Sequence, residues 1–166
     1  MIPNMLIVLL AALIPMVVGF LYYNPKLAGT VWMKESGMTE ERVQSGNMLK
    51  MLLLSFICAF LFSFFLFGFV VHQTDVYSLY ASEPGFMEEN SAVMNRLDTL
   101  MKEFGDRFRT FGHGSFHGVL IALLFVVPIL GTVSIFERKS FKYVAINGGY
   151  WVITLALMGG ILCQWG

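Results

Sequence analysis

Four long apolar stretches without charged residues dominate the pattern of hydrophobic and polar positions along this chain. They cover residues 2–23, 51–71, 118–136 and 143–165. A helix of about 20 residues crosses the hydrocarbon core of a bilayer, and backbone in lipid must satisfy its own hydrogen bonds. The stretches are apolar on every side rather than in alternation, which favours helices over barrel strands. We therefore expect an all-α fold, a four-helix transmembrane bundle in a single integral-membrane domain over residues 1–166.

The first connecting segment contains the signals of two shorter helices. Asn24 followed by Pro25 is typical of an N-cap and a first helical residue, and Gly37 is a favourable helix end. These residues predict a short interfacial helix. Thr39, followed by two glutamates, predicts another helix start, because acidic side chains are favourable in a first turn. We expect that helix to continue into the span that begins at residue 51.

The second connecting segment, residues 72–116, is the only substantial extramembrane part of the predicted fold. Apolar residues recur in it at spacings of three and four, which is typical of one face of an amphipathic helix. Such a helix lies on the membrane surface, caps the bundle or docks on a partner protein. The residues of the apolar face are Val93, Leu97, Leu100, Met101, Phe104, Phe108 and Phe111.

Composition supports the membrane interpretation. Hydrophobic residues make up 57% of the chain and charged residues 13%, against about 25% charged in soluble domains. The net charge is zero, and the eleven Lys and Arg residues are split among three loops without a basic stripe, so nucleic acid is not an expected partner. Both cysteines lie inside apolar runs, which does not indicate a disulfide framework. The lipid bilayer is the expected partner, and the first stretch is interpreted as a retained helix rather than a signal peptide.

The distribution of positive charge predicts an orientation. The first and third connecting segments together hold seven Lys and Arg residues, whereas the termini and the second segment hold four. Positively charged loops favour the cytoplasmic side of a membrane. We expect the first and third loops in the cytoplasm, and both termini and the second loop outside.

The three histidines all map to one predicted membrane edge. His72 ends the second span, whereas His113 and His117 precede or open the third. Histidines four residues apart share one face of a helix, which suits two ligands of a transition metal, and Asp75 could add an oxygen ligand. The residues between His113 and His117 are Gly-Ser-Phe, so the glutamate of an H-E-x-x-H metalloprotease is absent. A metal site, a proton or anion site and interfacial hydrogen bonding are the three interpretations.

Small residues recur at helical spacing in two of the spans. Such stripes permit close approach of helix backbones, within one chain or between copies. They are more typical of helix packing than of a substrate path. The residues concerned are Ala145, Gly149, Ala156 and Gly160 in the fourth span, and Ser55, Ala59 and Ser63 in the second.

Polar groups inside the spans are few. Asn147 lies about one turn into the fourth span, and Asn24 is expected at the same level, so both are predicted to be buried polar residues with partners on other helices. Pro15 and Pro128 interrupt the first and third spans, where each removes one hydrogen bond of the helix. No span has an ionised residue in its interior, which argues against ion-coupled transport.

Several short patches of the chain resemble a known family. Together they resemble the small bacterial integral-membrane family catalogued as domain of unknown function 1761, and they cover most of the chain outside the second loop. The resemblance implies a multi-pass protein of the bacterial cytoplasmic membrane and assigns no reaction. The patches are VGFLYYNP at 18–25, WM at 32–33, SGMT at 36–39, HG at 117–118, FERKS at 136–140, INGGYW at 146–151 and LMGG at 157–160.

Three functional hypotheses follow from these patterns. The first is a non-enzymatic membrane protein, either a self-associating bundle or a subunit of a larger membrane complex. The second is a passive channel or transporter for a small solute, with Asn147 and the histidines at opposite ends of its path. The third is a metal-binding membrane enzyme that uses the histidine edge. The sequence contains no recognisable set of catalytic residues, which favours the first.

Overall fold

The computed structural model describes residues 2–166, and these residues form helices, turns and loops without a strand. Four helical segments are long and apolar enough to cross a membrane. They are α1 (Met5–Tyr22), α4 (Met48–Val70), a continuous segment over Phe111–Phe136, and α9 (Phe141–Trp165). The predicted all-α fold with four candidate membrane spans is confirmed.

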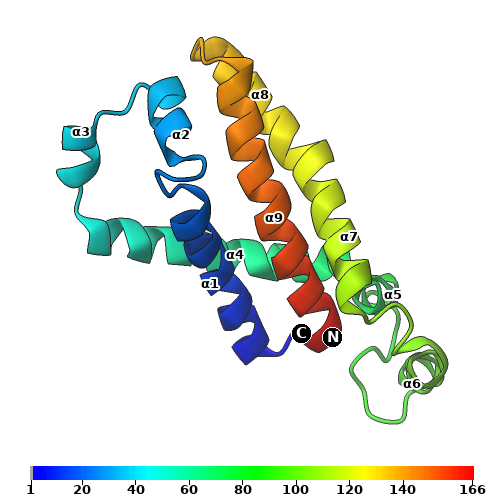
Figure 1. Ribbon diagram of the computed structural model, residues 1–166. Coiled ribbons are helices and arrows are strands. Elements are labelled where there is room, and N and C mark those ends of the chain that lie inside the picture. The colour runs from blue at the N-terminus through cyan, green and yellow to red at the C-terminus, as the bar shows by residue number, and fades with distance from the viewer. Residues whose placement is uncertain (1) are drawn as a thin grey trace.

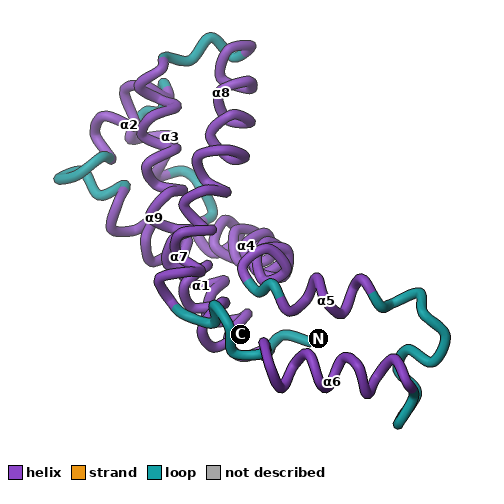
Figure 2. The backbone as a smooth tube through the Cα atoms, turned by 90° about the vertical axis from the view of Figure 1, so that its right-hand side faces the viewer, coloured by secondary structure: helices purple, strands orange, loops and turns teal. Residues whose placement is uncertain are grey.

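The spans are not all parallel. The segment over Phe111–Phe136 runs beside α9 along its length (Figure 1), and α1 also packs on α9. Helix α4 crosses these helices steeply, so that Figure 2 shows it end-on while α9 is seen from the side. The buried core lies where α4 passes α1 and α9. Its largest fully buried apolar side chains include Val8, Leu66, Val70, Leu155, Met158 and Leu162.

The third span consists of three helical pieces. It comprises α7 (Phe111–Ile121), the π-helical turn η1 (Ala122–Val126) and α8 (Val127–Phe136). Pro128 is the second residue after η1 and has no backbone N–H to donate. A wider π turn before this proline lets the chain continue as a helix without that donor. The span begins at 111, seven residues before the predicted start, because the Thr110 side chain caps it.

Glycines bring α7 and α9 into backbone contact. A Cβ atom at Gly114 would overlap the carbonyl oxygen of Gly159, and one at Gly118 would overlap that of Leu155. Both glycines are buried. Close approach of helix backbones is what small residues permit in membrane proteins, and here it fixes the position of the helix that carries two of the three histidines.

The small residues of the predicted stripes occupy different environments. Gly149 faces the Tyr22 hydroxyl, and Gly160 faces Phe111 and Ser115. These contacts lie within the chain. Of the remaining members, Ala59 and Ser63 are buried, Ala156 is half-buried, and Ala145 and Ser55 are exposed.

The helices of the first loop differ in their limits from the prediction. Helix α2 (Gly29–Ser36) begins four residues after Pro25, because residues 23–28 form turns in which Asn24 Oδ1 accepts from the Lys26 N–H at 3.0 Å. Gly37 ends α2 with a positive φ of 74°, as predicted. Helix α3 (Glu40–Gln44) is capped by Thr39 as predicted, but it stops at Ser45. The expected continuation into the second span is wrong, because Asn47 caps α4 separately.

The second loop folds into two helices outside the spans. These are α5 (Gln73–Leu79) and α6 (Ala92–Phe104), which pack on each other. On α6, Leu97 is fully buried, whereas Arg96 and Asp98 are exposed. The predicted apolar face extends too far, because α6 ends at Phe104 and Phe108 lies in a turn. Helix α5 was not predicted.

Candidate metal centre

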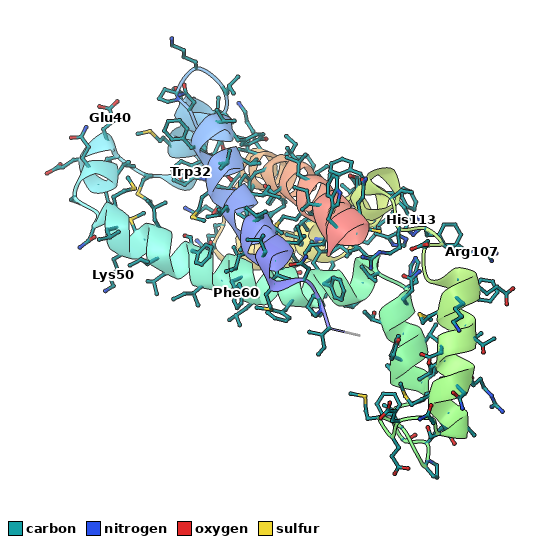
Figure 3. All side chains as sticks on the ribbon, turned by 90° about the horizontal axis from the view of Figure 1, so that it is seen from below. Trp32, Glu40, Lys50, Phe60, Arg107 and His113 are labelled. Atoms are coloured by element: carbon teal, nitrogen blue, oxygen red, sulfur yellow. The ribbon has the colours of Figure 1, made fainter. Side chains whose placement is uncertain are left out.

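The three histidines come together from two separate parts of the chain. His72 lies between α4 and α5, directly after the buried Val70 and Val71. His113 and His117 lie one turn apart on α7. Figure 3 shows His113 at the end of the molecule where α5 and α6 lie, far from Glu40 and Lys50. The end of one span and the start of another therefore build one site.

Local capping explains why the two histidines of α7 share a face. The Thr110 hydroxyl accepts from the His113 backbone N–H at 3.2 Å, and Gln164 Oε1 of α9 accepts from the Phe111 N–H at 3.1 Å. The helix start is thereby fixed relative to α9. A regular helix from residue 111 places positions 113 and 117 on the same side.

The imidazole nitrogens converge closely. Nε2 of His72 lies 2.9 Å from Nε2 of His113. Each of the three histidines offers one ring nitrogen within 4.8 Å of the others. The ring centroids are 4.5 to 5.1 Å apart, and the rings are inclined to one another by 62° to 77°. The three side chains thus point their nitrogens toward one small volume.

These distances fit a metal ion with small adjustments of the side chains. Zn–N bonds of about 2.0–2.1 Å at tetrahedral angles place two ligand nitrogens about 3.3 Å apart. The His72–His113 nitrogen separation of 2.9 Å is a little shorter than that value, and all three nitrogens lie within 4.8 Å of one another. Without an ion, two neutral imidazoles at 2.9 Å form one N–H···N hydrogen bond. The geometry therefore permits both a hydrogen-bonded pair and a three-nitrogen metal site.

The predicted oxygen ligand is not part of this group. Asp75 lies on α5, is exposed, and does not belong to the group of converging ligand atoms. The donors brought together are three imidazoles. Imidazole binds transition metals in its neutral form, so the charge of a bound ion would not be neutralised by these ligands.

Phe108 covers the histidines, and the sequence pattern did not identify this role. Its ring stacks on His113 with centroids 4.9 Å apart and planes 20° apart, and it meets His72 edge-on at 6.3 Å. Its backbone adopts a left-handed φ of 64°. The turn that carries it is tied to α9, because the Cys163 thiol donates to the Phe108 carbonyl at 3.3 Å.

Gln73 anchors the loop beside the site. Its side-chain amide is buried and donates to the carbonyl oxygens of Phe104 and Arg107, at 3.1 and 2.9 Å. These bonds join the start of α5 to the end of α6 next to His72. A buried glutamine in a loop is a weak sequence signal, and no spacing pattern pointed to it.

The opposite end of the spans contains a hydrogen-bonded polar cluster. The Tyr23 hydroxyl donates to Asn147 Oδ1 at 2.8 Å, and Asn147 Nδ2 donates to the Tyr143 carbonyl at 2.8 Å. The Tyr22 hydroxyl donates to the Ile146 carbonyl at 3.0 Å. Burial, with a smaller contribution from neighbouring tyrosines, raises the pKa of Tyr23, so its hydroxyl stays a donor. Asn24 is half-buried beside this cluster.

An all-helical fold with four helices long and apolar enough to cross a membrane is compatible with a multi-pass membrane protein, and the three-histidine cluster lies at one end of it. The chain belongs to the family described as Protein of unknown function (DUF1761), whose model matches residues 6–163. The resemblance drawn from the short sequence patches is thereby confirmed. Comparisons with curated proteins and with solved structures gave no match.

Proposed function

We propose that this protein is a metal-binding membrane protein, with His72, His113 and His117 as the ligands of one transition-metal ion. The observation that supports this is the convergence of one nitrogen from each histidine within 4.8 Å. A hydrogen bond between the imidazoles of His72 and His113 would not require the imidazole of His117 beside them. Two segments separated by 40 residues of chain bring all three to one point.

The ligand set indicates the class of metal. Imidazole suits zinc, copper, iron and nickel, whereas calcium and magnesium prefer oxygen ligands. Three protein ligands leave one position of a tetrahedral ion for water or another molecule, which is the arrangement of catalytic zinc sites. This supports the hypothesis of a metal-dependent membrane enzyme at the histidine edge without naming its reaction.

The other two hypotheses have less support. The small residues that suggested self-association include Gly149 and Gly160, and both contact helices of the same chain. A passive path would have to run from Asn147 to the histidines, past Leu155, Met158 and Leu162, which are fully buried in an apolar core. Self-association and a place in a larger membrane complex remain secondary proposals.

Metal analysis of the purified protein tests the proposal. The protein in mild detergent is expected to hold about one equivalent of a transition metal per chain after dialysis against zinc or copper, measured by plasma mass spectrometry. H113A and H72A should each reduce this metal content strongly, because each variant keeps only two of the three imidazole ligands. Asp75→Asn is the matched control, since Asp75 is exposed and outside the group. Equal metal content in all four proteins, or none in the wild type, would overturn the proposal.

A further inference from the structure

A pocket of about 270 Å³ lies directly beside the histidine cluster. His72 and Phe108, which belong to the cluster and its cover, form one side of it. Gln73, Phe104 and Arg107 are also among its lining residues. Figure 3 shows Arg107 at the same end of the molecule as His113. Val76 and Met101 complete its lining, which is mostly apolar, and the proposed ligand His72 and the cationic residue Arg107 both belong to it.

The guanidinium of Arg107 is held in position. Its central carbon lies 4.5 Å from the centroid of the Phe104 ring, and the Arg107 carbonyl accepts from the buried Gln73 amide. A guanidinium stacked on an aromatic ring keeps its in-plane N–H donors available for an oxyanion. Arg107 is exposed, and the stacking of its guanidinium on Phe104 orients the N–H donors that an oxyanion could accept from.

Charge balance indicates what the pocket binds. Three neutral imidazoles leave the full charge of a divalent ion in place, and a half-buried charge without a counter-charge is unfavourable. None of the described residues that line the pocket is Asp or Glu. The chain therefore supplies a second positive charge beside the metal instead of a carboxylate. The pocket lining therefore offers no counter-ion, which favours one from solution.

We propose that this pocket binds a small oxyanion, a carboxylate or inorganic phosphate, next to the metal ion of the histidine cluster. The proposal rests on the proposed function, because a divalent metal ion supplies two of the three positive charges and Arg107 the third. Arg107 donates hydrogen bonds to the oxyanion, and Gln73 fixes the loop that presents Arg107. The metal centre would then act on, or sense, an anionic small molecule.

Nuclear relaxation of the anion tests this inference. Cobalt(II) is loaded into the protein in an uncharged detergent, and the relaxation of phosphate (³¹P) and of acetate (¹³C) is measured during titration. A bound anion close to paramagnetic cobalt relaxes faster, and the effect should saturate. Zinc-loaded protein is the diamagnetic control. If only phosphate or only acetate relaxes faster, that result shows which of the two oxyanions the pocket binds.

The variant R107Q separates the two proposals. Loss of a charged hydrogen bond should weaken anion binding by about tenfold or more, while the cobalt content stays that of the wild type. R96Q removes an exposed arginine of α6 that does not line the pocket, and it should bind the anion normally. Normal cobalt content with no saturable relaxation, or equal affinities in R107Q and R96Q, would overturn the anion site alone. Absence of bound cobalt in the wild type would overturn the metal site itself.

Discussion

Phe108 holds a backbone conformation that is uncommon for an aromatic residue. A positive φ costs a non-glycine residue roughly 1–3 kcal/mol and persists only where the surrounding structure imposes it. Here the turn at 105–110 is held by hydrogen bonds to α9 and by Gln73. The result is a ring that lies on His113 and against His72 although 57% of its surface is exposed.

We expect F108A to weaken metal binding. Residues that orient metal ligands contribute about 10- to 100-fold to metal affinity, and the stacked ring restricts the rotamer of His113. The variant keeps a Cβ at position 108, so the backbone strain is unchanged. The dissociation constant for zinc, measured by competition with a chelator in detergent, should rise at least about tenfold. Phe141→Ala, at an exposed phenylalanine of α9, is the control and should leave the affinity unchanged; equal constants would reject an orienting role.

Tyr23 makes a hydrogen bond whose loss can be measured. Y23F leaves Asn147 Oδ1 without its donor, and a hydrogen bond between membrane helices contributes about 0.6 kcal/mol on average and up to about 1.7. Thermal unfolding in detergent, followed by circular dichroism, should shift to lower temperature. Tyr143→Phe is the matched control, because only the backbone carbonyl of Tyr143 takes part in the cluster. An equal shift in both variants would contradict the assigned role of the Tyr23 hydroxyl.

Individual residues were predictable where the interaction is local. His113 and His117 share a helix face by spacing alone, and the caps Thr39 and Gly37 act through the next few residues of the chain. The arrival of His72 at the same point depends on how 40 residues of loop fold, so the sequence left three interpretations open. Phe108 was placed on a helix face, because hydrophobic spacing does not detect a turn with a positive φ.

At the scale of elements, the contact of α7 with α9 controls the site. G118A would place a Cβ against the Leu155 carbonyl, and overpacking of this kind costs typically about 1–3 kcal/mol. We expect a lower unfolding temperature in detergent, together with loss of metal, because α7 must move away from α9. Gly131→Ala in α8 is the matched control, since nothing lies within 4 Å of the added atom. Comparable stability of both variants would show that the helices can separate without cost.

The four spans were predictable because each has about the length and apolar character that a membrane crossing requires, whereas the breaks between short helices were not. Asn47 caps α4 and Ser91 caps α6, but Asn and Ser are common in loops, so these signals are not specific. The steep crossing of α4 was also beyond prediction. Its hydrophobic pattern is nearly uniform around the helix, and an apolar helix without a polar face can be inclined in many ways.

For the whole molecule, the two ends differ in chemistry. Both termini, α5 and α6 lie at one end, and α2, α3 and the turn before α9 lie at the other (Figure 1). The first end has the histidine cluster and Arg107, and the second has the tyrosine and asparagine cluster. The excess of Lys and Arg in the first and third loops is at the second end. Orientation would therefore decide which compartment supplies the proposed metal ion and anion.

Cysteine labelling of intact cells tests this orientation. Cys58 and Cys163 are first replaced by Ala, and single cysteines are then introduced as S82C in the loop after α5 or E137C after α8. Both positions are exposed. If positive loops stay in the cytoplasm, an impermeant maleimide labels S82C in intact cells and E137C only after permeabilisation. The histidine centre would then take its metal from outside the cytoplasm. Labelling in the reverse order would place that centre in the cytoplasm and show that an excess of seven positive residues over four does not set the topology here.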